Sequence, residues 1–175
     1  MPDPRIAIFI PAYNCAKTLP GVLDRIPQQV KDAAEEIFVV DDASSDGTDQ
    51  VARDYKDRRG LGSLQVYRNE RNLGYGGSQK AAYRHAIAQG YDIVVMLHGD
   101  AQYAPEHVEG LLEPIRRGEA DLMFGSRIEA PGATGNRYCV NRPSPHPNSS
   151  MDEHARRERP CRFNTASKPC SWFRL

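Results

Sequence analysis

Residues 5–126 alternate between short apolar runs and stretches in which apolar residues recur at helical spacing. Short β-branched runs closed by polar or turn residues are typical of buried strands, and a period of about 3.6 residues is typical of amphipathic helices. We therefore expect strands at residues 5–13, 36–42, 63–69, 91–97 and 120–126, and helices at residues 16–30, 43–57, 76–90 and 105–118.

Proline, glycine and small polar residues mark the ends of these helices. Pro20 suits the first turn of the first helix and Pro27 its end, because proline has no amide hydrogen to donate. Ser45 or Asp46 is expected to cap the second helix. Gly90 should end the third helix, since glycine readily adopts the left-handed conformation found there.

Strands and helices that alternate in this way predict an α/β fold, with a mostly parallel sheet flanked by helices on both faces. In such sheets ligands bind beyond the carboxyl ends of the strands. Four polar loops occupy such positions and are candidate ligand-binding segments: PAYNCAK, DDASSDG, HGDAQY and GSRIEA.

The composition narrows the class of protein. With 175 residues and a formal net charge of zero, the chain has ordinary globular composition, and its charge gives no case for nucleic-acid binding. No apolar run reaches the roughly 18 residues of a membrane-spanning helix, and the start of the chain does not resemble a signal peptide. Four cysteines without paired spacing indicate a reduced, cytoplasmic protein.

Charge and composition change near residue 130. Residues 1–130 contain 15 Lys and Arg against 20 Asp and Glu (net −5), whereas residues 131–175 contain 8 against 3 (net +5). The second segment also holds six prolines and has no sustained strand or helix period. We expect one domain at residues 1–130 and an irregular, disordered tail at residues 131–175, whose cysteines and histidines fit no usual zinc spacing.

Two adjacent carboxylates, Asp41 and Asp42, close the predicted strand at residues 36–42. A charge at the end of a buried strand needs compensation, which hydrogen bonds to the base or ribose of a nucleotide would supply. The alternative is a turn that caps the following helix, where Asp and Ser are common. The spacing alone favours neither interpretation.

The loop HGDAQY is a candidate metal site. Alternate side chains of an extended loop point the same way, so His98, Asp100 and Gln102 are expected to converge. Asp100 and Gln102 offer the oxygen ligands that Mg²⁺ and Mn²⁺ prefer, and a histidine suits Mn²⁺ better than Mg²⁺. The alternative is a polar loop that only caps the helix beginning at Pro105.

Two further segments are candidate phosphate sites. Arg127 follows the last predicted strand, where its guanidinium would suit a phosphate, although a surface arginine is the simpler explanation. The glycine-rich NLGYGGSQKAA precedes a helix but departs from the P-loop pattern, since Ala81 follows Lys80. We interpret it mainly as a turn that lets the helix pack closely.

Taken in order, IPAYN, VVDDASSDGT, RNLGYGG, HGDAQYAPE and GSR form a series that resembles the family-2 inverting glycosyltransferases of the GT-A fold. Within that family the chain is similar to the branch of dolichyl-phosphate mannose synthase and other polyprenyl-phosphate glycosyltransferases. The resemblance covers roughly residues 5–130. It implies a Rossmann-like nucleotide-diphospho-sugar transferase fold, a UDP- or GDP-linked sugar donor, a divalent Mg²⁺ or Mn²⁺, a lipid-phosphate acceptor and a place at the inner face of the membrane.

The resemblance also assigns roles by position. Asp100 matches the second acid of the family's D-x-D motif, which holds the metal and diphosphate, and Arg127 matches a phosphate-binding arginine. Gln102 matches a glutamine beside the metal. The residues expected around the nucleotide are Pro11, Tyr13, Asp41, Asp42 and Gly99.

Two positions depart from the family pattern: His98 stands where the first D-x-D acid is usual, and Cys15 where a glutamate is common. The segment after GSR departs as well. The codons of Pro-Ser-Pro-His at residues 143–146, shifted by one base, permit Ala-Leu-Thr-Ala, close to the family's N-R-x-L-T helix. We hypothesise a frameshifted tail with an incomplete acceptor site; the alternative is a genuine disordered basic tail.

Three functions are compatible with these patterns. The first is an inverting glycosyltransferase. The second is a nucleotidyltransferase, which would need a glycine- and lysine-rich signature that PAYNCAK does not supply. The third is a non-catalytic module that retains the nucleotide-sugar pocket.

Overall fold

The computed structural model describes residues 3–125 and 139–141. The predicted domain boundary near residue 130, the irregular tail and Arg127 concern residues outside this description. Within it, the predicted α/β fold is confirmed, and all five expected strands form.

Six strands form one sheet in the order β3-β2-β1-β4-β6-β5. β1 pairs in parallel with β2 and β4, and β2 pairs in parallel with β3, whereas β6 is antiparallel to both β4 and β5. The strands are β1 (Ile6–Ala12), β2 (Ala34–Asp41), β3 (Leu64–Arg68), β4 (Ile93–Met96), β5 (Leu122–Phe124) and β6 (Cys139–Asn141).

Strand β6 was not anticipated from the sequence. It has only three residues and follows a segment without strand or helix signals, so no period could reveal it. Only the three-dimensional structure shows that β6 pairs with β4 and β5.

Helices connect the parallel strands, as expected. They are α1 (Leu19–Arg25), α2 (Gln28–Ala33), α3 (Thr48–Arg59), α4 (Gly74–Gln89) and α5 (Val108–Arg116), the last preceded by a 3₁₀ turn, η1 (Pro105–His107). The predicted helix at residues 16–30 is divided in two, because Pro27 ends the first part and begins α2 from its N-cap position.

The cap of α3 corrects an expectation. Neither Ser45 nor Asp46 is the N-cap residue, which is Gly47 with a left-handed φ of 81°. Asp46 lies one residue before this N-cap, and its side chain accepts a hydrogen bond from the amide of Thr48 at 3.1 Å. Gly90 ends α4 in the left-handed conformation, as predicted.

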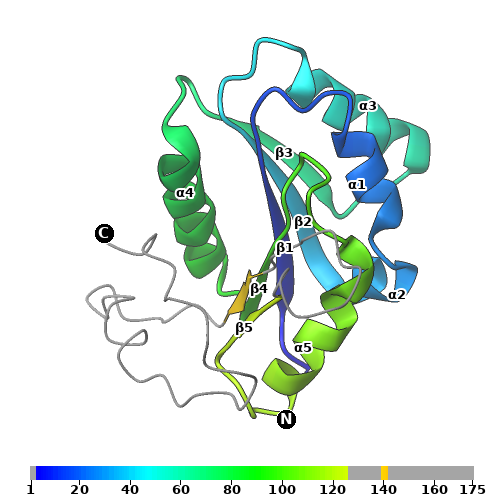
Figure 1. Ribbon diagram of the computed structural model, residues 1–175, viewed down its shortest axis with the longest axis vertical. Helices are drawn as coiled ribbons and strands as arrows, with labels where there is room; N and C mark the ends of the chain where they lie inside the picture. Colours follow the sequence, from blue (N-terminus) through cyan, green and yellow to red (C-terminus); the bar gives the residue numbers. More distant parts are fainter. Residues whose placement is uncertain (1–2, 126–138, 142–175) are drawn as a thin grey trace. The chain divides into compact units, whose positions relative to one another are not determined.

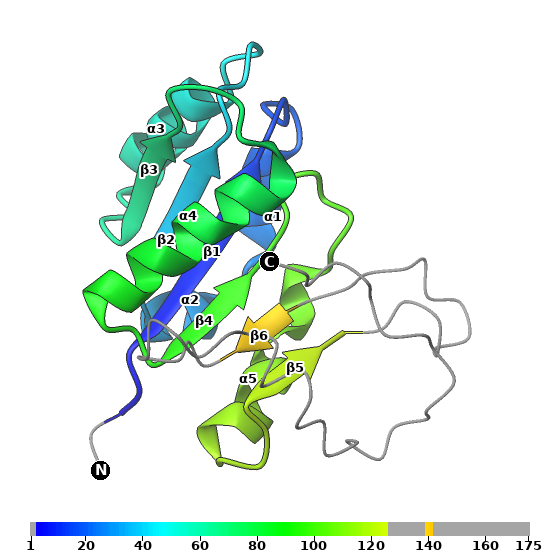
Figure 2. The ribbon, with the colours of Figure 1, turned by 90° about the vertical axis from the view of Figure 1, so that its left-hand side faces the viewer.

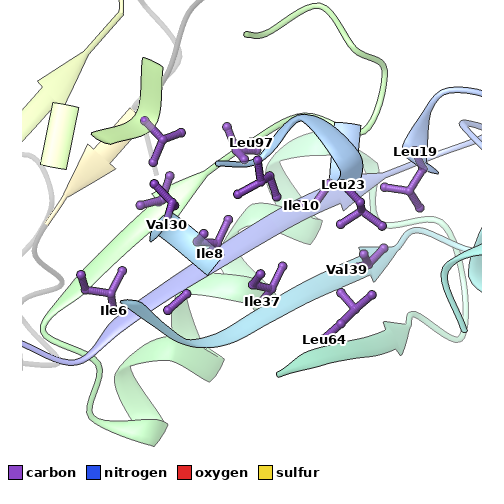
Figure 3. Close-up of a cluster of buried hydrophobic side chains, with 14 of the residues drawn as sticks. Ile6, Ile8, Ile10, Leu19, Leu23, Val30, Ile37, Val39, Leu64 and Leu97 are labelled. Atoms are coloured by element: carbon purple, nitrogen blue, oxygen red, sulfur yellow. The ribbon is translucent and has the colours of Figure 1, made fainter. Parts of the chain in front are cut away.

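Helices cover both faces of the sheet. Figure 1 shows α4 on one side, and α1, α2, α3 and α5 on the other; Figure 2 looks onto the α4 side. Alternate side chains of β1 explain this arrangement. Ile8 and Ile10 pack in the larger core with α1, α3 and α5 (Figure 3), whereas Ala7 and Phe9 pack with α4.

The topology brings three loops to one edge. From β1 the chain moves outward to β2 and β3, and then returns to pair β4 on the other side of β1. The strand order therefore reverses between β1 and β4, which is where open α/β sheets bind ligands. Among the described helices, none is both long and apolar enough to cross a membrane.

The buried side chains of β1 should contribute strongly to the free energy of unfolding. Ile8 is fully buried in the larger cluster, so Ile8→Ala should lower the free energy of unfolding by about 2–5 kcal/mol through lost burial and a residual cavity. Ile87→Ala is the matched control, because Ile87 is 44% exposed and should cost less than about 1 kcal/mol. Urea unfolding followed by circular dichroism measures both, and equal losses would contradict the packing described.

Candidate functional site

The loop after β1 lies against the loop after β2. The amide of Asn14 donates to Ser44 Oγ at 2.9 Å, and the Asn14 side-chain oxygen accepts from the amide of Ser45 at 3.0 Å. Asn14 has a left-handed φ of 49°, which turns the chain at this point. Pro11 lies within β1 and Tyr13 follows it with 56% of its surface exposed, so the Tyr13 ring is accessible to a ligand.

Asp41 ends β2 as a fully buried carboxylate. Its Oδ2 atom accepts from Nη1 of Arg68 at 2.6 Å, and the same nitrogen donates to Asp49 at 2.9 Å. Nη2 of Arg68 donates to the Ser44 carbonyl at 2.8 Å. Asp41 Oδ1 has no hydrogen-bond partner among the described residues. The buried charge is therefore compensated from inside the protein by Arg68.

Sequence reasoning missed Arg68. It is 27 residues from Asp41 in the chain, and the two become partners because β3 pairs in register with β2. No local pattern signals that pairing, but a cation in the last position of a strand predicted beside β2 would have been the place to look.

Asp42 connects β2 to the glycine-rich turn. Its Oδ1 atom accepts from the Asn69 side chain and from the Leu73 amide, both at 2.8 Å. Burial alone would raise the pKa of Asp42, but the hydrogen bonds from Leu73, Asn69 and Ser78 outweigh it and hold that pKa below its ordinary value. The capping alternative thus applies in a changed form, since Asp42 caps the start of α4 and not the start of α3.

His98 begins the loop after β4. Its Nε2 atom lies 2.8 Å from the Tyr75 hydroxyl, and its ring packs against Tyr103 with centroids 4.2 Å apart. Burial lowers the pKa of His98, and the nearby Asp100 carboxylate opposes this shift. The imidazole is therefore favoured in its neutral form, which is the form that binds metal ions.

The rest of this loop is not extended, so that part of the sequence argument is wrong. Ala101 has a left-handed φ of 63°, and the amide of Gln102 folds back to donate to Asp100 Oδ1 at 3.0 Å. A short polar side chain that bonds the backbone two residues on favours such a turn over extended chain. Both Asp100 and Gln102 remain exposed.

Gly99 is required by close packing beneath this loop. A Cβ atom there would lie 2.8 Å from Cys15 Sγ, and the Gly99 carbonyl accepts from Thr18 Oγ1 at 2.6 Å. Burial raises the pKa of the Cys15 thiol to about 11, so Cys15 is an uncharged packing residue. The role of Gly99 in nucleotide binding remains a prediction.

The side chains of this loop suit a hard divalent ion that takes its other ligands from the substrate. In residues 3–125 and 139–141, no group of three His, Cys, Asp or Glu side chains gathers as a metal cluster. Asp100 is exposed, and its Oδ2 atom has no hydrogen bond to the described part of the protein. One carboxylate completed by phosphate oxygens is a common arrangement for Mg²⁺ and related ions, so these residues fit the predicted metal.

A family model described as "Glycosyl transferase family 2" matches residues 7–174. The chain belongs to glycosyl transferase family 2. The predicted resemblance is thereby confirmed. Two curated members of the family are similar in sequence: an undecaprenyl-phosphate mannosyltransferase of Micrococcus luteus is 37% identical over 70% of this chain, and a polyprenol monophosphomannose synthase of Mycolicibacterium smegmatis is 33% identical over 76%. The chain spans about half of their length, 48% of each.

Solved structures agree on the fold. A mannosyltransferase from Pyrobaculum calidifontis, in complex with GDP-Man and Mn²⁺, matches 79% of this chain and 44% of its own with a TM-score of 0.62 and 21% identity. The glucosyl-3-phosphoglycerate synthase of Mycobacterium tuberculosis, in complex with Mn²⁺ and UDP-glucose, matches 66% of this chain and 40% of its own with a TM-score of 0.52 and 27% identity. The predicted GT-A type of α/β fold is confirmed.

The contact between Gly99 and Cys15 should appear as energetic coupling. Gly99→Ala places a methyl group 2.8 Å from Cys15 Sγ and should lower the free energy of unfolding by about 1–3 kcal/mol. In a Cys15→Ala background the same change should cost less, because the sulfur is gone. Gly21→Ala is the control, since no atom lies within 4 Å of its added Cβ. Equal costs in both backgrounds would rule out the contact as the cause.

Asp42 should make stability depend on acid pH. Because its pKa is lower in the folded protein, the unfolded chain binds the proton more readily, and the stabilisation is present at neutral pH and lost as pH falls through the folded value. Asp42→Asn should be less stable than the wild type at pH 7 and should lose less further stability between about pH 5 and pH 3. Chemical denaturation at several pH values tests this, and parallel pH profiles would refute it.

Proposed function

We propose that this chain binds a nucleotide-diphosphate sugar at the carboxyl ends of β1, β2 and β4 and transfers the sugar, with inversion, to a polyprenyl phosphate. The observation that carries the proposal is Asp100, an exposed carboxylate in the loop beyond β4, at the point where the strand order reverses. The two curated relatives reported above are named as an undecaprenyl-phosphate mannosyltransferase and a polyprenol monophosphomannose synthase, which favours a mannosyl donor.

The donor would lie across the three loops. Tyr13 offers an exposed ring to the nucleoside, and Pro11 shapes the end of β1 beneath it. Asp41 and Asp42 are committed to Arg68 and to the start of α4, so we assign them mainly to shaping the nucleoside side of the site. Asp100, Gln102 and His98 would hold a divalent ion at the diphosphate.

The chemistry needs positive charge at the leaving group. A bound divalent ion supplies it by neutralising the oxygens of the departing nucleotide diphosphate. Asp100 would hold that charge in place, and we assign a phosphate-binding role to Arg127, as the resemblance implies. A lipid phosphate is already anionic at neutral pH and needs little help from a general base, whereas a hydroxyl acceptor would require a carboxylate base.

A lipid acceptor sets where the protein would work. Polyprenyl chains are confined to the bilayer, so the acceptor phosphate lies at the membrane surface. We propose peripheral contact of this chain with the cytoplasmic face of the membrane, where nucleotide sugars are available.

A second candidate is a module that binds the nucleotide sugar without transferring it. Binding and transfer assays distinguish the two functions.

The metal role of Asp100 is testable by calorimetric titration with GDP and UDP, with and without Mn²⁺. Wild-type protein should bind one of the two nucleotides at least about tenfold more tightly with Mn²⁺, and Asp100→Asn should lose that enhancement. Asp57→Asn, which removes an exposed carboxylate from α3, should retain it. The transfer assay uses radiolabelled GDP- or UDP-sugar and a short polyprenyl phosphate.

The outcomes separate the candidates. Absence of any Mn²⁺-linked nucleotide binding in the wild type would sink the glycosyltransferase proposal. Metal-linked binding without transfer or donor hydrolysis would favour the binding module. The nucleotide that binds more tightly, GDP or UDP, identifies the base of the sugar donor.

A further inference from the structure

Helix α4 is the only described helix on its side of the sheet, and its charge differs from that of the helices on the other side (Figure 1). Residues 71–91, which include α4, contain three Lys and Arg and no Asp or Glu. Each of the other four described α-helices contains at least one acidic residue. The absence of acid is therefore a local property of α4, since acidic residues outnumber basic ones by 20 to 15 in residues 1–130.

The side of α4 that faces away from the sheet carries a strip of exposed residues. They recur every three or four positions, which places them on one face of the helix: Leu73, Gly76, Lys80, Arg84 and Ile87. We call these five residues the outer strip of α4. The buried residues of the helix lie on the opposite face, towards the sheet: Ser78, Ala82 and Ala86.

The two cations of the outer strip, Lys80 and Arg84, belong to no ion pair within the described residues. Six other described arginines do pair with a carboxylate: Arg5, Arg25, Arg59, Arg68, Arg116 and Arg117. The positive charge of the strip is thus not neutralised by a neighbouring acid. A surface of this kind attracts an anionic partner.

Aliphatic side chains flank these cations along the helix. Leu73 and Ile87 are each 44% exposed. Helices that bind at a membrane surface combine the same two kinds of residue, because their cations meet anionic headgroups while their apolar side chains enter the boundary with the acyl chains. A nucleic acid would engage the cations through its phosphates but would leave the aliphatic side chains in water. The composition of the strip therefore favours a lipid surface.

The outer strip begins beside the candidate site. The amide of Leu73 donates to Asp42 Oδ1 at 2.8 Å, and the hydroxyl of Tyr75, two residues further on, lies 2.8 Å from His98 Nε2. His98 belongs to the loop that also carries Asp100. A bilayer in contact with the strip would therefore bring its headgroups close to this loop.

We propose that the outer strip of α4 docks on an anionic membrane surface, with Lys80 and Arg84 at the lipid phosphates and Leu73 and Ile87 at the boundary with the acyl chains. The purpose of this contact rests on the function proposed above, because docking here would hold the site beside a polyprenyl phosphate in the same bilayer. The contact itself needs neither a metal ion nor a sugar donor.

Vesicle binding tests the strip without any sugar transfer. Wild-type protein is sedimented with vesicles of phosphatidylglycerol and phosphatidylcholine, or of phosphatidylcholine alone, and should bind the anionic vesicles at least about tenfold more tightly at low salt. Lys80→Gln combined with Arg84→Gln should weaken that binding about 20- to 30-fold, because each cation near an anionic surface contributes a factor of about five.

The matched control is Arg53→Gln combined with Arg58→Gln. Both arginines are exposed on α3, which lies on the other side of the sheet, and neither belongs to an ion pair within the described residues. This variant loses the same charge and should bind vesicles as the wild type does. Lys80→Arg combined with Arg84→Lys keeps the charge of the strip and should also bind normally.

The aliphatic residues distinguish a membrane from a purely ionic partner. Leu73→Ala combined with Ile87→Ala should weaken binding to the anionic vesicles at least about fivefold, because less apolar surface enters the bilayer. The same variant should bind heparin, a polyanion without an apolar phase, as the wild type does.

Three outcomes would overturn the proposal. They are a wild type that does not prefer anionic vesicles, equal losses in the α4 and α3 charge variants, and vesicle binding that is unchanged without the two aliphatic side chains. The last outcome would indicate a purely ionic partner such as a nucleic acid.

The nucleotide titration described above keeps this proposal separate from the proposed function. Mn²⁺-linked nucleotide binding without vesicle binding refutes only the docking surface. Vesicle binding through the strip without metal-linked nucleotide binding supports the surface and refutes the transferase function.

Discussion

Strand β1 is hydrogen-bonded to a parallel neighbour on each side and is buried on both faces. Because β2 and β4 run parallel to it, all three strands end at the same edge of the sheet, and their loops must meet there. The helices follow from the same strand, since its alternate side chains require an apolar cover on each face. The location of the site is thus a consequence of the pairing of β1.

Polar groups at that edge are compensated by partners from other elements. Asp41 is neutralised by Arg68 of β3, and Asp42 satisfies the amide that starts α4. These contacts hold the edge proposed to bind the nucleoside in shape without a ligand, which would lower the cost of ordering it on binding. Asp100 differs from both, because its carboxylate is exposed and has no ion-pair partner in the described part of the chain.

The two departures from the family pattern have different physical meanings. Cys15 is a buried, uncharged residue whose sulfur fills the space beneath Gly99, so the change from a glutamate removes a charge and adds a packing contact. His98 replaces an acid with a neutral ring held by Tyr75 and Tyr103.

The sequence by itself determined the order of strands and helices, the parallel sheet and the loops that carry the site, because apolar period and turn residues are local properties. It also predicted a metal-binding role for Asp100, from its position after β4 and from a resemblance that needs no tertiary information. Only the tertiary structure decided which polar groups became partners, as with Asp41 and Arg68 or His98 and Tyr75, which lie 27 and 23 residues apart. It also decided the turn at Ala101, since strand neighbours and loop dihedrals depend on how distant segments pack together.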